Sequence, residues 1–216
     1  AFVGREFNWK SRMNGFDNII DQTVFIPKTV RSVEDNAFTA SSANTPSTSV
    51  LRFVLTDAEE RPNAWSKNFV TNQLKTVYNY YSSVIINENE KNSLYFLLND
   101  NNAIYARMLD MNAVSILFPS EISFNDRIFT LKEIAEEALI DRDAVLNSLI
   151  FATDSTLERI GDHLFTSSSV NTLNVDGTNL EIPQTVNYIG INIPFKETAW
   201  YSMKQTDDFV YLNDVC

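Results

Sequence analysis

The chain has 216 residues and a formal net charge of −11 at pH 7, with 44% hydrophobic and 12% aromatic residues. A uniformly acidic surface repels nucleic-acid phosphates and anionic lipid heads, so either partner would need a local basic patch. One histidine, one cysteine and 5 glycines exclude zinc centres of several His or Cys ligands, disulfide scaffolds and glycine-rich phosphate loops. The composition therefore predicts a folded protein with no metal or other cofactor.

The N-terminal segment combines mixed charge with bulky aromatic residues. We predict that residues 1–38 form an arm, which either docks on a neighbouring subunit or folds back on its own domain. The aromatic side chains that would make this contact are Phe2, Phe7, Trp9, Phe16 and Phe25. Residues 39–49 are small and polar, which predicts a flexible Ser/Thr-rich linker or loop. Residues 50–216 are expected to form a single domain.

Apolar runs predict the first elements in chain order. The segments Thr23–Ile26 and Val50–Leu55 are expected to be strands, and Val84–Ile86 with Leu94–Leu98 a hairpin. Near-helical spacing of apolar residues predicts a helix over Asn63–Tyr81. A short helix over Ala103–Met111 and a buried strand over Val114–Phe118 follow.

The most distinctive segment is Thr130–Leu149. Thr130 and Glu133 have the spacing of a capping box, and an apolar stripe follows them. Ile134-Ala135, Val145 and Leu149 have a spacing that resembles the helix-turn-helix of bacterial DNA-binding proteins. That resemblance implies a DNA-binding regulator, although its reading face would be net negative. A structural helical hairpin over the same residues is the alternative that we favour.

Two further features could carry chemistry. His163 lies near the end of a third expected helix over Thr153–Phe165, where the helix dipole would stabilise a charged imidazolium. Asp141 and Asp143 follow Glu136 and Glu137, and these carboxylates alone could chelate Ca²⁺ or Mg²⁺. A solvated acidic helix face is the interpretation that we favour. A glycoside hydrolase needs only two carboxylates, so that class stays open even though no spacing selects a pair.

The C-terminal quarter is predicted to be rich in strands. Leu173–Val175 and Leu180–Ile182 flank an Asp-Gly turn, and Thr185–Ile193 alternates in polarity. Two further strands are expected over Trp200–Met203 and Phe209–Leu212. No internal repeat is visible. The fold class expected is α+β, with mixed or antiparallel β segments around a central helical region over about residues 130–165.

An acidic chain with an aromatic arm and no residues for common catalytic sites favours a non-enzymatic structural or assembly subunit. Low glycine content, many asparagines and no cysteine pair are similar in style to connector, neck or tail proteins of tailed-phage virions. This similarity implies homo-oligomers or neighbouring structural proteins as partners, with assembly in the host cytoplasm. No apolar run approaches the ~18 residues needed to cross a bilayer, so we expect no membrane partner, and no secretory signal peptide is visible. A helix-turn-helix regulator and a carboxylate-based glycoside hydrolase are the alternatives.

Overall fold

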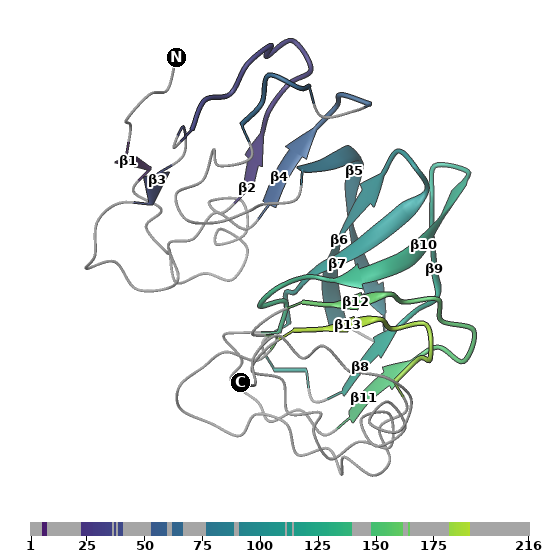
Figure 1. The fold of residues 1–216 in the computed structure, drawn as a ribbon. Helices are drawn as coiled ribbons and strands as arrows, with labels where there is room; N and C mark the ends of the chain where they lie inside the picture. Colours follow the sequence, from purple (N-terminus) through teal and green to yellow (C-terminus); the bar gives the residue numbers. More distant parts are fainter. Residues whose placement is uncertain are drawn as a thin grey trace. The chain divides into compact units, whose positions relative to one another are not determined.

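The fold is described by a computed structural model (Figure 1). The residues that it describes are 6–7, 23–35, 37, 39–40, 53–59, 62–66, 77–88, 91–110, 112–113, 115–139, 148–161, 164 and 182–190. The chain divides into two compact units. Unit 1 comprises Ala1–Tyr81 and Leu98–Asp100, and unit 2 comprises Ser82–Leu97 and Asn101–Cys216. Every helix or strand assigned within the described ranges is a β-strand.

Unit 1 is built on parallel strand pairs. Strand β1 (Glu6–Phe7) pairs with β3 (Thr39–Ala40). Strand β2 (Thr23–Phe25) pairs with β4 (Phe53–Thr56), which in turn pairs with the first residues of β5 (Val77–Glu88). All four residues of β4 are buried, as expected for a short central strand of parallel neighbours.

The core of unit 1 forms around Trp65. This indole packs with Ile26, Val33 and Val54, and its Nε1–H donates a 2.9 Å hydrogen bond to the carbonyl oxygen of Val30. Val33 and Trp65 also form an isolated parallel β-bridge, and Trp65 follows a turn in which its N–H donates to the Pro62 carbonyl at 2.9 Å. The helix predicted over Asn63–Tyr81 is therefore wrong at both described ends, because Trp65 bridges to Val33 and residues 77–81 belong to β5.

Unit 2 contains two sheets. In the first, the strand order from the far half of β5 is β5-β6-β7-β10-β12-β13, with β9 paired to β10. These strands are β6 (Lys91–Leu98), β7 (Asn102–Met108), β9 (Glu121–Phe124), β10 (Arg127–Ile134), β12 (Arg159–Ile160) and β13 (Tyr188–Ile189). The second sheet pairs β8 (Ser115–Phe118) with β11 (Ser148–Phe151) in parallel.

The parallel strands of unit 2 have a β-solenoid-like arrangement. The chain passes from β7 in the first sheet to β8 in the second, returns to β10, and passes again to β11 (Figure 1). Strands β7, β10, β12 and β13 are parallel neighbours in that order. Each of these strands therefore forms one layer of the stack, which we call a rung. Neighbouring rungs bury their inward side chains against one another.

One row of inward-facing, paired residues, which we call the buried ladder, shows how neighbouring rungs pack together. Tyr105, Ile134, Ile160 and Ile189 are successive Cα partners across the parallel strands, and all are buried. They are roughly 26 to 29 residues apart, within the range of ~20–50 residues typical of solenoid repeats. The interior continues through aromatic contacts, since the Tyr105 ring lies 4.9 Å from Phe118, which stacks 5.2 Å from Phe151.

The expected α+β class, with a helical region near residues 130–165, is wrong. Residues 127–134 form β10, residues 148–151 form β11 and residues 159–160 form β12. The short helix predicted over Ala103–Met111 is instead the strand β7. By contrast, the strands predicted at Thr23–Ile26, Val50–Leu55 and Val114–Phe118 are confirmed within a few residues, as is the pair of strands over Val84–Leu98.

The strand-rich C-terminal quarter is described only over residues 182–190. There, β13 falls inside the alternating segment predicted over Thr185–Ile193. The remaining strands predicted in this quarter lie outside the described residues, as does most of the linker predicted over residues 39–49. The proposed division into arm, linker and a single domain stays a prediction.

Candidate functional site

The aromatic residues predicted to mediate arm contacts fall partly within the described chain. Phe25 lies in β2, where its ring is 47% exposed and packs edge-on against Tyr80 at 6.2 Å. The backbone of Phe7 pairs with Ala40 between β1 and β3. The other residues of the set, Phe2, Trp9 and Phe16, lie outside the described residues.

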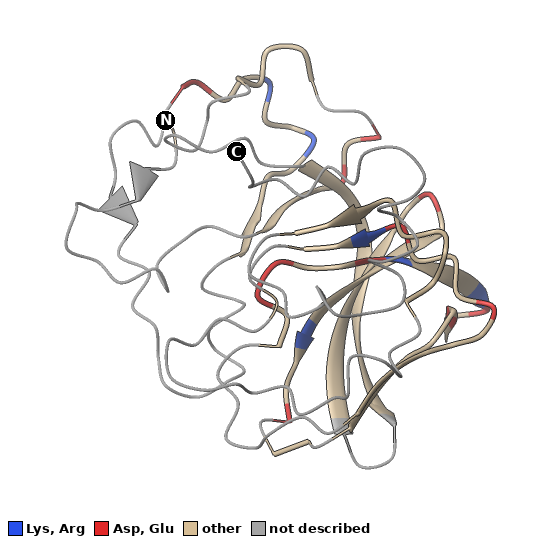
Figure 2. Ribbon diagram, turned by 60° about the horizontal axis from the view of Figure 1, so that its bottom comes forward, with Lys and Arg blue, Asp and Glu red and all other residues tan. Residues whose placement is uncertain are grey.

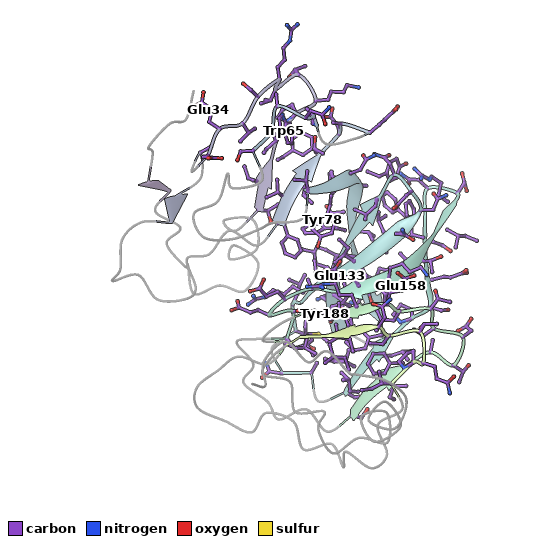
Figure 3. The ribbon with its side chains drawn as sticks, viewed as in Figure 1. Glu34, Trp65, Tyr78, Glu133, Glu158 and Tyr188 are labelled. Atoms are coloured by element: carbon purple, nitrogen blue, oxygen red, sulfur yellow. The ribbon has the colours of Figure 1, made fainter. Side chains whose placement is uncertain are left out.

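In the described part of the chain, a connected group of ionisable side chains lies along β10, β12 and β13. We call it the polar ladder: Lys132, Glu133, Glu158, Arg159 and Tyr188. Glu133, Arg159 and Tyr188 are successive Cα partners in parallel strands. Figure 3 labels Glu133, Glu158 and Tyr188, which lie together over these strands.

A bulge in β10 creates the ladder. Leu131 pairs with Ala103 and Glu133 with Ile104, so Lys132 is an extra residue on the β10 side. As a result Lys132 and Glu133 are both half-exposed, between the buried Leu131 and Ile134. A β-bulge commonly redirects a side chain in this way. Here it places two neighbouring charges of opposite sign toward β12.

The charges of the ladder are paired. Lys132 Nζ donates to Glu158 Oε1 at 2.7 Å and to the carbonyl oxygen of Thr156 at 3.2 Å. Arg159 Nε lies 3.5 Å from Glu133 Oε1, and the Arg159 guanidinium lies 3.8 Å from the centroid of the Tyr188 ring. The backbone takes part as well, since the Glu158 N–H donates to the Lys132 carbonyl at 2.9 Å.

The contacts of the polar ladder join neighbouring strands to one another, and they suit the packing of these strands better than they suit catalysis. Each carboxylate of the ladder contacts a cation on the neighbouring rung, and the face of the Tyr188 ring is covered by Arg159. Across the described part of the chain, no group of three or more His, Cys, Asp or Glu residues could hold a metal ion. We therefore assign the polar ladder to the cohesion of the rungs.

The outer face of the β8–β11 sheet is different in character. Leu117 and Ile150 are Cα partners and are 43% and 50% exposed. Beside them, Ser115 and Ser148 share a 2.7 Å hydrogen bond between their hydroxyl groups. The inward residues Phe118 and Phe151 stack in the core, so the alternation of the strands fixes the aliphatic pair on the outside. We call Leu117 and Ile150 the exposed aliphatic pair.

The motif proposed for DNA binding is not formed as expected. Thr130 and Glu133, predicted to make a capping box, both lie in strand β10. Residues 136–139 form a turn, in which Ala138 and Leu139 are buried, as is Ala135 before it. The first helix of the proposed helix-turn-helix is therefore wrong. Asp141, Asp143 and Val145 lie outside the described residues, as does His163.

Of the residues in the polar ladder and the exposed aliphatic pair, the sequence singles out only Glu133, and it does so for a capping box and not for an ion pair with β12. No linear signal could join Glu133 to Arg159 or Leu117 to Ile150, because each pair is set by a parallel register and not by local spacing. Leu117 alternates with buried neighbours in β8, but this alternation can be seen only once the strand itself is known.

Comparison with known proteins gives no relative. No family model matches the chain, and neither a curated protein nor a solved structure does. Among the described residues there is also no helix long and apolar enough to cross a membrane.

Proposed function

We propose that the chain is a non-enzymatic structural subunit that associates with copies of itself in a multi-protein particle. The observation that carries this proposal is the exposed aliphatic pair. Leu117 and Ile150 stand in register on a regular two-stranded sheet, where alternation holds their side chains outward. Paired aliphatic side chains on a rigid scaffold provide an apolar contact at little cost in conformational entropy.

The stacked rungs of unit 2 support the same proposal. A β-solenoid-like scaffold is held by neighbour-to-neighbour contacts, such as the Tyr105–Ile134–Ile160–Ile189 ladder, and its strands present regular outer faces. Such faces suit repeated protein contacts. The virion assignment to a connector, neck or tail position of a tailed phage rests on composition and stays a prediction.

The proposal is tested by the mass of the purified chain in solution. We expect light scattering to give a mass well above 24.6 kDa, the mass of one chain. Ile150→Lys should lower this mass, because it places a charge in the apolar contact. Ile128→Lys is the matched control: Ile128 is also exposed, at 57%, but its Cα partner across the strand is Ser123 and not an aliphatic residue.

A wild-type chain that stays at 24.6 kDa over the whole accessible concentration range would overturn the proposed self-association. An oligomer that responds equally to Ile150→Lys and Ile128→Lys would show that the exposed aliphatic pair does not carry the contact.

A further inference from the structure

We propose that the outer edge of β5 over residues 82–88 pairs antiparallel with the same edge of a second copy of the chain. This inference rests on the proposed function, because it names one contact by which the subunit associates with itself. It concerns a different strand from the exposed aliphatic pair, and the two can be tested separately.

The edge is open within the part of the chain that the structure describes. Strand β5 lies between β6 and β4, but the register with β4 covers only Val77, Tyr78 and Asn79. Over residues 82–88, in unit 2, no described strand pairs with the side of β5 that faces away from β6. A row of strand N–H and C=O groups with no neighbour is a template for another strand.

The sequence of this edge lacks two of the features by which proteins protect such strands, namely charged residues and prolines. Lysines, prolines and bulges commonly interrupt exposed edges. The sequence of residues 77–87 contains no charged residue and no proline, in a chain whose net charge is −11. In Figure 2 the two long strands that lead to the grey hairpin tip are tan, without red or blue. The first carboxylate, Glu88, comes at the end of the strand.

The side chains favour a copy of the same edge as the occupant. Ser83, Ile85 and Asn87 are exposed, whereas Ser82, Val84 and Ile86 are half-buried. Directly opposed residues in an antiparallel pair share a face, so a two-fold axis at Ile85 would place exposed residues opposite exposed residues. Ile85 would then face Ile85 of the second copy, and Val84 would face Ile86.

Charge favours the same pairing. In that register the residue pairs formed over residues 83–87 contain no charged residue. Two acidic chains repel each other over most approaches. The uncharged run over residues 77–87 is a place where they can meet without opposing like charges directly.

The test is the mass of the full-length chain and its variants by light scattering after gel filtration. A two-fold contact predicts an even number of copies in the wild type. Ile85→Lys places two lysines opposite each other at the axis and should halve the mass. Ile128→Lys, which introduces the same charge at another exposed isoleucine, should leave the mass unchanged.

A charge-reversal pair makes the test specific to self-pairing. Ile85→Lys and Ile85→Glu should each halve the mass alone, whereas an equimolar mixture of the two should restore the wild-type mass. A variant that merely fails to fold would not be rescued by its partner. Circular dichroism of each variant against the wild type confirms that the strands are retained.

The outcomes separate the two proposals. An oligomer that keeps its mass in Ile85→Lys would overturn the β5 contact and leave the proposed function in place. A wild-type chain that is monomeric throughout would overturn both. Halving by Ile85→Lys without rescue in the mixture would also overturn the two-fold pairing at Ile85.

Discussion

Ile134 of β10 and Ile160 of β12 are Cα partners in neighbouring parallel strands, and the exposed fraction of both side chains is 0%. Ile134 also pairs with Tyr105 of β7, so it has a buried partner on each side in the ladder. The stability of unit 2 should therefore be sensitive to this position, whereas exposed positions on the same strand should matter little.

Ile134→Ala is expected to lower the free energy of unfolding by about 2–5 kcal/mol, through lost burial and the cavity left behind. Ile128→Ala, on the same strand but 57% exposed, is expected to change it by no more than about 0.5 kcal/mol. Urea unfolding followed by circular dichroism measures both values. Equal effects at the two positions would contradict the assigned faces of β10.

Gly161 leaves no room for a side chain. A Cβ atom there would lie 2.3 Å from the backbone nitrogen of Glu136 and 2.6 Å from the carbonyl carbon of Ala135. The Gly161 N–H also donates to the Ile134 carbonyl at 2.7 Å, which fixes the separation of the two segments. Gly161→Ala should lower the free energy of unfolding by at least ~1–3 kcal/mol, since backbone atoms must move.

Thr153→Ala is a suitable control for Gly161→Ala, because Thr153 is exposed in a nearby turn. The thermal unfolding midpoints of the two variants give the comparison. If Gly161→Ala matched Thr153→Ala in stability, the close approach of residues 135–136 to Gly161 would be wrong.

The hairpin between β9 and β10 turns through two residues with positive φ, at Asn125 (49°) and Asp126 (59°). Two-residue hairpin turns with this backbone accept Asn, Asp and Gly but disfavour β-branched residues. Asp126→Val should lower the free energy of unfolding by about 1–2 kcal/mol, whereas Asp126→Gly should not lower it. Chemical denaturation of the two variants measures both free energies of unfolding. An Asp126→Val variant as stable as the wild type would contradict the turn.

The polar ladder should contribute modestly and in a salt-dependent way. A double-mutant cycle with Lys132→Met and Glu158→Gln is expected to give a coupling energy of about 0.2–1 kcal/mol, because both side chains are partly exposed. The coupling should shrink between low salt and ~1 M salt, where the Debye length is about 3 Å. A coupling that is unchanged by salt would argue against the ion pair.

The sequence predicted strands well where apolar residues alternate or form short runs. Val114–Phe118 and the hairpin over Val84–Leu98 were found in this way, close to β8, β5 and β6. The sequence predicts a helix at β7 because residues 103–108 are buried on both faces of the strand, so no alternation is visible. A continuous apolar run does not by itself distinguish a buried strand from a buried helix.

The error at Thr130–Leu149 has a specific physical cause. The bulge at Lys132 separates the buried Leu131 and Ile134 by three positions, which is a helical spacing. The turn that follows buries Ala135, Ala138 and Leu139, which continues the same spacing. A bulged strand followed by a buried turn therefore carries the periodicity of an amphipathic helix. Only the pairing with β7 and β12, which is non-local, resolves the ambiguity.

The predicted arm can be tested with a boundary that the structure supplies. Residues 23–25 pair with β4, and Ile26 packs with Trp65 in the core of unit 1, so removing all of residues 1–38 would remove part of that core. Deletion of residues 1–22 keeps both contacts. If the aromatic residues of the arm dock on a neighbouring subunit, this deletion should lower the oligomer mass while the thermal midpoint stays close to that of the wild type.

Substitution of Trp9 by serine in the full-length chain is the milder companion to this deletion. It removes one large aromatic side chain and leaves the chain length and the net charge unchanged. A lower oligomer mass in both variants would support docking of the arm on a neighbour. A lower thermal midpoint with an unchanged oligomer mass would instead show that the arm folds back on its own chain, because burial within one chain stabilises the monomer and not the contact between copies.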